Sequence, residues 1–227
     1  MKSIKKYETI INEALRSALE YDTPEGQINE FISFFGKHIG SDRIYIFEDD
    51  EEHHVTNNTY EWCAEGITPQ IEHLQGVNME VIDWWYDTFD EGKSVIISDV
   101  EELKGVHQVS YNMLKYQNVR KVVVSPLHHK GQIKGFFGVD NPPAVDYNAL
   151  TMFLDMIGTM LISLLKIRNT FQKEQYNASM SSYSALSEIY LSMHLIDIKT
   201  GKYQLVKTAK YIEDKCEELN SDNFTKR

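Results

Sequence analysis

The sequence lacks the features that mark several classes of protein. It has two cysteines, Cys63 and Cys216, far apart and without metal-type spacing, which favours a reducing compartment over a disulfide framework. Its most apolar stretch, residues 152–167, is too short to span a bilayer and contains Asp155. Residues 1–15 have basic side chains but not the continuous apolar segment of a secretory signal. We therefore expect a cytoplasmic protein with no membrane span in this chain.

Basic residues are also scarce. The 227 residues include 23 Lys and Arg against 34 Asp and Glu, for a formal net charge of −11. A nucleic-acid-binding surface needs clustered basic side chains, so that class is excluded. The length and the ordinary apolar content predict one well-buried domain with a remainder, rather than a disordered chain.

What is present most clearly is a β-hairpin at residues 118–143, NVRKVVVSPLHHKGQIKGFFGVDNPP. Its first arm, residues 119–127, is rich in β-branched residues, and Lys130 and Gly131 supply a turn. The second arm, residues 132–140, is apolar on both faces. This pattern predicts a pair of strands in the middle of a sheet.

The residues before the hairpin alternate between helical and strand patterns. Helices are predicted at residues 4–19 and 24–40, the second with Thr23 as N-cap and Pro24 at its first position. β-branched and aromatic residues predict strands at 43–48, 56–64 and 95–97. Densely spaced apolar residues predict a short helix at 78–89 that packs on the sheet. A further helix is expected at 101–116.

After the hairpin, a long helix begins at Tyr147. Apolar residues recur at spacings of three and four, which is a coiled-coil rhythm interrupted by Arg168. The stripe consists of Leu150, Leu154, Ile157, Leu161, Leu164 and Phe171. A second small unit is predicted beyond it, with a helix at 185–190, a strand at 191–198, a turn at 200–201 and a strand at 203–206.

The order of elements and several segments resemble a GAF domain of bacterial sensory proteins. The matching segments are TYEWCAEGITPQIEHLQGV, the WW that follows, SVIISDVEEL and QNVRKVVVSPLHHKGQIKGFFGVDN. The resemblance implies an α+β fold, similar also to PAS domains: an antiparallel sheet of five or six strands, helices on both sides and a long C-terminal signalling helix. It covers residues 5–168. The tail ALSEIYLSMHLIDIKTGKYQLV is similar to the opening of a PAS-like domain.

The resemblance also implies a domain organisation and a function. Residues 1–168 would form the sensory domain, 169–184 a helical linker, and 185–227 a partial PAS-like segment or the truncated end of a longer chain. The function would be ligand binding and dimerisation, as a homodimer through the N- and C-terminal helices, in bacterial signal transduction. The sequence has no GGDEF, EAL or kinase signature, so we expect no enzyme here and a diguanylate cyclase, phosphodiesterase or kinase output elsewhere.

Ligands in this family lie between the sheet and the helices and loops that cover it. The matching positions are Tyr60, Trp62, Trp84, Trp85, Asp99, Tyr111, Ser125 and Phe137. Two interpretations fit the aromatic residues: they line a pocket, or they fill the core with their polar groups satisfied internally. Asp99 and Ser125 are the stronger polar candidates, because Ser125 interrupts an apolar strand and a buried hydroxyl needs a partner.

No cofactor or metal is expected. The cyclic-nucleotide motif of GAF domains is incomplete here, and a bilin-attachment cysteine would come later than Cys63. Adjacent histidines on a strand point to opposite faces, so the pairs at 53–54 and 128–129 cannot chelate through neighbouring rings. The acidic run at 48–52 lacks the spaced ligands and glycine of a calcium loop.

Two other functions stay open on the sequence. One is a ligand-free structural spacer that dimerises. The other is a thiol-based reductase of free methionine sulfoxide, which would need a thiolate and a resolving cysteine. Cys216 lies outside the GAF-like region, so a buried structural thiol fits Cys63 better. The identity of the ligand and the direction of regulation are not encoded in these residues.

Overall fold

The computed structural model describes residues 2–143 and 146–200. The chain divides into two compact units, Met1–Arg168 and Asn169–Arg227. The first unit contains every strand in the described residues. In chain order the elements are α1 (Lys2–Ala18), α2 (Pro24–Ile39), β1 (Arg43–Asp50), β2 (Val55–Cys63), β3 (Val77–Asn78), η1 (Met79–Ile82), α3 (Asp83–Asp90), β4 (Val95–Ile97), η2 (Val100–Leu103), α4 (Gln108–Tyr116), β5 (Val122–His129), β6 (Gln132–Asp140) and α5 (Tyr147–Thr200).

The strands form one six-stranded antiparallel sheet in the order β3-β2-β1-β6-β5-β4. The predicted hairpin is confirmed as β5 and β6, and β6 lies between β5 and β1. Lys130 and Gly131 both have positive φ, 51° and 77°, as a two-residue hairpin turn of type I′ requires. The sheet therefore has this hairpin near its middle and two very short strands at its edges.

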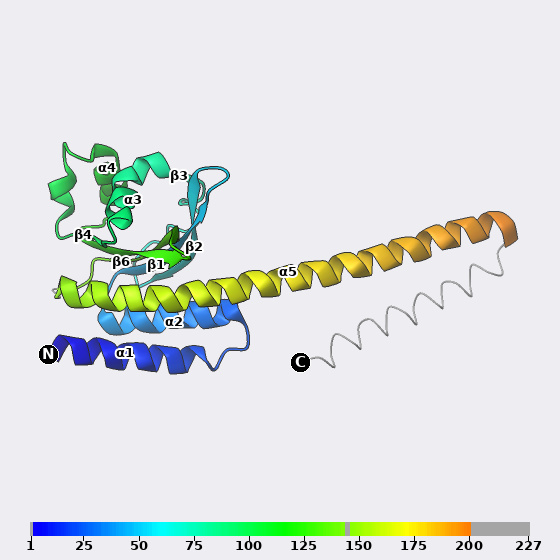
Figure 1. Cartoon of the computed structure of the whole chain (residues 1–227), viewed down its shortest axis with the longest axis horizontal. Coiled ribbons are helices and arrows are strands. Elements are labelled where there is room, and N and C mark those ends of the chain that lie inside the picture. The colour runs from blue at the N-terminus through cyan, green and yellow to red at the C-terminus, as the bar shows by residue number, and fades with distance from the viewer. Residues whose placement is uncertain (1, 144–145, 201–227) are drawn as a thin grey trace. The chain divides into compact units, whose positions relative to one another are not determined.

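Helices cover both faces of the sheet, which confirms the predicted α+β class (Figure 1). The layer of α1, α2 and the first part of α5 packs on one face through Phe31, Phe35 and Leu154. The layer of η1, α3, η2 and α4 packs on the other through Trp85, Phe89 and Leu114. The sheet separates these two apolar clusters, so the side chain of a strand residue belongs to one cluster or to the other.

The second helix begins and ends as its sequence predicts. Thr23 is the N-cap of α2 and accepts a hydrogen bond from the Gly26 amide at 3.1 Å, with Pro24 in the first turn. Gly40 ends the helix in the left-handed conformation, φ 77°. These caps fix where β1 starts, three residues after Gly40.

The helix predicted at residues 101–116 is wrong in its first half. Those residues form η2 and α4, separated by a turn at which Gly105 has φ 79°. A residue in the left-handed region cannot continue an α-helix, and Asp99 caps the short η2 instead. The short helix expected at 78–89 is a 3₁₀ turn followed by α3, and the edge strand β3 precedes it.

The first part of the apolar stripe on α5 lies in the core. Leu150, Leu154, Ile157 and Leu161 are at most 1% exposed and pack in the cluster of α1, α2 and the sheet, whereas Phe171 is 37% exposed. Spacings of three and four describe any amphipathic helix, so the spacing alone did not distinguish a coiled coil from a helix on a sheet. By length and hydropathy alone, Tyr147–Tyr183 is long and apolar enough to cross a membrane.

The strand predicted at residues 191–198 is wrong, because α5 is helical through Thr200. A short apolar run has no clear period, and Leu, Met and Lys are good helix formers. The strand expected at 203–206 and Gly201 of the predicted turn lie outside the described residues.

Candidate functional site

A cavity of about 40 Å³ lies between the sheet and the layer of α3 and α4. Apolar and aromatic side chains form most of its wall: Tyr45, Phe47, Leu74, Val77, Ile82, Trp85, Met113, Leu114 and Phe136. The polar side chains in the lining are Arg43, Asn58, Glu61, Gln117 and Asp140. An apolar concavity with a few convergent polar groups is typical of a small-molecule site.

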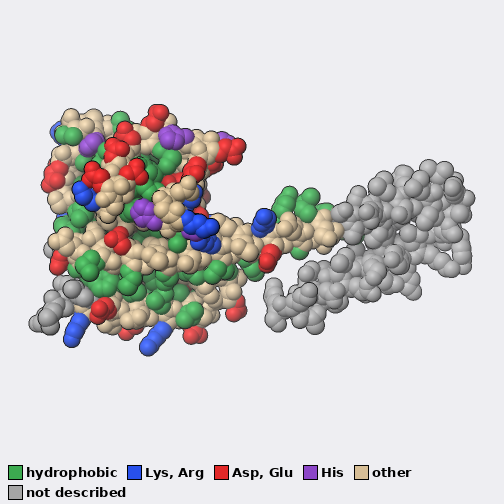
Figure 2. Space-filling model, viewed as in Figure 1, with side chains coloured by type: hydrophobic (Ala, Val, Ile, Leu, Met, Phe, Trp, Pro, Cys, Tyr) green, Lys and Arg blue, Asp and Glu red, His purple; other side chains and the backbone are tan. Residues whose placement is uncertain are grey.

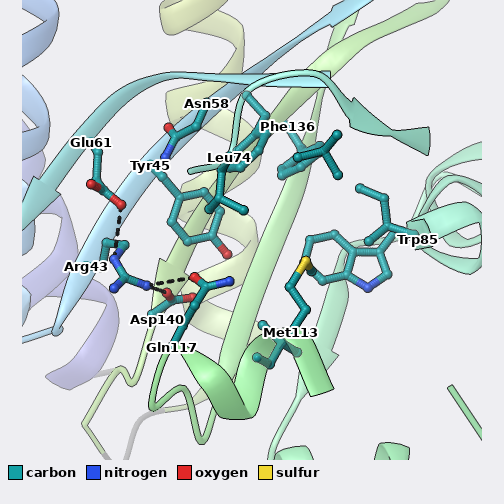
Figure 3. Close-up of a pocket in the computed structure, with 14 residues that line it drawn as sticks. Arg43, Tyr45, Asn58, Glu61, Leu74, Trp85, Met113, Gln117, Phe136 and Asp140 are labelled. Carbon is teal, nitrogen blue, oxygen red and sulfur yellow. Dashed lines mark hydrogen bonds and ion pairs between the residues drawn. The ribbon is translucent and has the colours of Figure 1, made fainter. Parts of the chain in front are cut away.

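The aromatic part of the wall is a connected cluster. Phe47 and Phe136 stack with their ring centroids 4.6 Å apart, and Trp85 meets Phe136 edge to face at 5.5 Å. Trp85 is 3% exposed, and its indole Nε1 has no hydrogen-bond partner in the described residues. This side of the cavity is therefore lined by aromatic rings (Figure 3).

The polar part is set by the register of three neighbouring strands. Arg43 on β1 lies opposite Asp140 on β6, and Tyr45 lies opposite Glu61 on β2. Tyr45 also faces Gly138, where a Cβ atom would come within 2.2 Å of the tyrosine ring. The absence of a side chain at Gly138 lets the Tyr45 ring lie across β6 toward Gln117 and Asp140 (Figure 3).

Arg43 is held between two carboxylates. Its Nη1 donates to Asp140 Oδ2 at 2.8 Å, and its Nε faces Glu61 Oε1 at 3.1 Å. The three side chains are 2–4% exposed. Nη1 also donates to Gln117 Oε1 at 3.3 Å and Nη2 to the carbonyl of Thr68 at 3.0 Å. The guanidinium group thus has four acceptors around it, of which Glu61 Oε1 pairs with it by charge but without hydrogen-bond geometry.

Each of the two carboxylates has one buried oxygen without a hydrogen-bond partner in the described residues: Asp140 Oδ1, and Glu61 Oε1, which faces Arg43 Nε. Glu61 Oε2 accepts hydrogen bonds from the amides of Gln70 and Ile71, at 2.8 and 3.1 Å. Asp140 Oδ1 has no hydrogen-bond partner among the residues that the structure describes. Burial raises the pKa of Asp140 to about 6, against the opposing attraction of Arg43 and the nearby Tyr45 hydroxyl. Asp140 is therefore a buried acceptor with spare capacity.

A bulge in β2 adds Asn58 to the same cavity. Ile46 pairs with Tyr60 and Phe47 with Asn58, so Thr59 is unpaired. One extra residue reverses the alternation of side chains. Asn58 and Glu61 therefore both face the cavity, while Tyr60 between them faces the opposite cluster.

Of the eight predicted site residues, only Trp85 lines this cavity. Tyr60, Trp62 and Phe137 belong to the cluster on the α1, α2 and α5 side, where Gly36 leaves room for the Trp62 ring. Ser125 faces that side too, fully buried, and its hydroxyl pairs with the Ser94 hydroxyl at 2.7 Å. The predicted set therefore divides between the two faces of the sheet.

The other three lie on the α3 and α4 side but outside the cavity. Trp84 stacks on His107, with centroids 4.3 Å apart, and donates to Ser110. Asp99 is exposed and caps η2, and the Tyr111 hydroxyl donates to Glu101. Each of these three side chains thus has a hydrogen-bond partner within the chain.

The sequence did contain a signal for the missed residues. Arg43 begins a strand whose next residues are buried, and Asp140 ends one. A charged residue inside such a run needs a buried partner of opposite charge. What the sequence did not provide was the pairing of β1 with β6, which joins residues 97 positions apart.

Cys63 lies beside this cluster, opposite Arg43 in the register. Burial first, and then Glu61, raises the pKa of its thiol, so the thiol form predominates at neutral pH. No group of three or more His, Cys, Asp or Glu with metal-site geometry occurs in residues 2–143 and 146–200. The His53 ring contacts Asp50 at 2.7 Å on the surface.

Comparison with known proteins identifies the fold. No protein-family model matches the chain, and no curated protein matches it in sequence. Solved structures do match it in three dimensions, at low identity. One is the GAF domain of a phosphoenolpyruvate-protein phosphotransferase from Coxiella burnetii, with a TM-score of 0.58 and 10% identity, covering 75% of this chain and 98% of that one.

Two further matches hold small molecules. The phycocyanobilin-bound GAF domain of a cyanobacterial phytochrome has a TM-score of 0.56 and 16% identity, covering 74% of this chain and 96% of that one. Free methionine-R-sulfoxide reductase from Neisseria meningitidis, in complex with its substrate, has a TM-score of 0.55 and 12% identity, covering 74% and 92%. The chain therefore has the fold of a GAF domain.

Proposed function

We propose that residues 1–168 are a sensory or regulatory module that binds a small molecule in the cavity lined by Arg43, Glu61, Trp85 and Asp140. The observation that carries this proposal is Asp140. Its Oδ1 is a buried acceptor without a partner in the described residues, in the wall of an aromatic cavity. An unsatisfied buried group of this kind costs stability, and a ligand that donates to it would recover that cost.

The structures of similar fold support a ligand over a ligand-free spacer. The cyanobacterial GAF domain is bound to phycocyanobilin and the Neisseria reductase to its substrate. A spacer would have its aromatic residues fill the space. Here Trp62 packs on the opposite face and Trp84 on His107, and the cavity remains.

We also propose a homodimer in bacterial cytoplasmic signal transduction, with an output domain outside these residues. Figure 2 shows hydrophobic side chains gathered over the layer of α1, α2 and α5, and acidic side chains over the opposite layer. On α5, Met152 and Met156 are 66% and 52% exposed, one helical turn apart. A second copy that covered them would bury apolar surface without disturbing the core.

A thermal-shift screen of the whole chain against nucleotides, amino acids, carboxylates and amines tests ligand binding. A true ligand raises the melting temperature by mass action, roughly 2.7 kcal/mol of stability at 100 times its Kd. Met113→Trp, which places a large side chain at the cavity wall, should abolish the shift. Val109→Trp, on the exposed face of the same helix, should leave it unchanged. A shift that survives Met113→Trp would place the ligand elsewhere, and no shift with any compound would favour the spacer.

A further inference from the structure

The charges that line the cavity do not balance. Arg43 is the only cationic side chain in the lining, and it faces two carboxylates, Glu61 and Asp140. At neutral pH the lining therefore has one more negative charge than positive. A cation entering the cavity would restore neutrality, whereas an anion would add a second excess charge in a poorly solvated site.

The two carboxylates also supply acceptors for such a cation. Asp140 Oδ1 and Glu61 Oε1 are buried and have no hydrogen-bond partner in the described residues. Two donors of lining residues, Arg43 Nε and Trp85 Nε1, also lack a hydrogen-bond partner there, so hydrogen bonding alone does not select between a donating and an accepting ligand. The excess negative charge makes that selection, because the remaining Arg43 nitrogens already donate to Asp140, Gln117 and the Thr68 carbonyl.

The wall opposite the carboxylates suits the body of such a ligand. Trp85, Phe47 and Phe136 present aromatic faces, which attract cations as well as apolar groups. The volume of about 40 Å³ exceeds the roughly 10–15 Å³ that one water needs, but only a few-fold. The ligand is therefore compact.

We infer that the cavity binds a small organic cation, a protonated amine or amidine with a short apolar body, whose N–H groups donate to Asp140. This inference rests on the proposed function and specifies the chemical class of its ligand. The cation would replace the missing hydrogen bond of Oδ1, and the apolar body would lie against Trp85.

Three probes of the same planar shape and different charge test the inference: acetamidinium, acetamide and acetate. Their few heavy atoms suit a cavity only a few times larger than one water needs. Each is titrated into the whole chain at about pH 7.5 and followed by calorimetry and thermal shift. We expect acetamidinium to bind about tenfold or more tightly than acetamide, a difference of about 1.4 kcal/mol, and acetate not to bind. The Asp140→Asn variant should lose about tenfold in acetamidinium affinity, and the exposed control Asp87→Asn should lose nothing.

A second arm needs no substitution and so does not depend on a variant that folds. Asp140 has a pKa of about 6, so at about pH 5 only about a tenth of it is ionised, while acetamidinium stays protonated. Affinity for acetamidinium should fall by about tenfold. The other titratable groups that face Asp140 are Arg43 and Tyr45 on β1 and Glu61 on β2. The Glu61→Gln variant removes the remaining carboxylate and should also weaken binding.

Three results would overturn the inference: no binding of acetamidinium, acetate binding as tightly as acetamidinium, or equal acetamidinium affinity in folded Asp140→Asn. Circular dichroism establishes that the variant is folded. Binding of acetate alone, blocked by Met113→Trp, would refute the cationic class and leave the proposed function standing. Failure of every compound in the wider screen would refute both.

Discussion

Arg168 on α5 donates a hydrogen bond from each of its two terminal nitrogens to a different oxygen of Glu48 on β1, at 2.8 and 2.7 Å. Nη1 also donates to the Tyr60 hydroxyl at 3.2 Å, and the guanidinium lies 5.5 Å from the centre of that ring. Glu48 shares its strand with Arg43 and Tyr45 of the cavity. A displacement of β1 by a ligand would therefore reach α5 through this pair.

The Arg168→Met variant should be less stable than wild type by roughly 1–3 kcal/mol. The pair is bidentate and its side chains are only 11% and 21% exposed, so the loss should exceed that of a surface ion pair but stay below that of a fully buried one. Urea denaturation measures the change. The control is Lys134→Met, which removes the more exposed pair with Glu51 and should cost less than about 0.5 kcal/mol. Equal losses in the two variants would contradict the prediction.

Asp140 should make the domain less stable as the pH rises from about 4 to about 6. Its pKa is about 6 in the folded protein and 3.8 as the ordinary value, so in this range the folded state binds more protons than the unfolded state. Its contribution is complete below pH 4 and lost above pH 6, and amounts to of order 3 kcal/mol. The measurement is the unfolding free energy of wild type minus that of Asp140→Asn across this range. The pH dependence from the other carboxylates is common to both proteins and cancels in this difference. A constant difference would refute the assignment.

The Gly138→Ala variant should lose roughly 2 kcal/mol or more, because the new methyl group would overlap the Tyr45 ring between two paired strands. Thermal or urea unfolding is the measurement. The matched control is Gly158→Ala on α5, where the nearest atom is a flexible Leu127 methyl at 3.3 Å. Alanine in a helix interior is better than glycine by about 1 kcal/mol, so this control should be neutral or stabilising.

The Met152→Glu and Met156→Glu substitutions, made together, should convert the proposed dimer to a monomer. Both side chains are exposed, so charge at these positions should weaken association while leaving the melting temperature of the monomer nearly unchanged. Light scattering after size exclusion measures the mass. The control Val109→Glu, exposed on α4, should stay dimeric. A monomeric wild type at high concentration would count against the homodimer itself.

Local patterns in the sequence were sufficient for most of the fold. The Lys130-Gly131 turn, the Thr23 cap and the β-branched arms of the hairpin each act over a few residues, and each lies where it was expected. The wrong predictions occurred where one local sequence pattern is compatible with two structures. Residues 191–198 can be helical or extended, and the stripe at Leu150, Leu154 and Ile157 suits either a coiled coil or a sheet-covering helix.

The site was harder to predict from the sequence than the fold, because its residues meet only through the order of the strands. Arg43 and Asp140 meet only because β1 pairs with β6, and Asn58 joins Glu61 only because Thr59 bulges out of register. Neither the strand pairing nor the bulge produces a periodic pattern in the sequence. Trp85 was found because a dense aromatic helix must cover a sheet, whereas Tyr60 and Phe137 were assigned without knowing which face each side chain would take.

The shortness of β3 leaves most of β2 to be covered by a loop. β3 pairs only with Val55 and Thr56 of the nine-residue β2. Beyond them, the Asn58 amide donates to the Leu74 carbonyl, and Glu61 accepts from the amides of Gln70 and Ile71. Long exposed edges are templates for strand addition and aggregation. The loop before β3 therefore takes the place of an edge strand, and shortening it would open β2 to pairing with another chain.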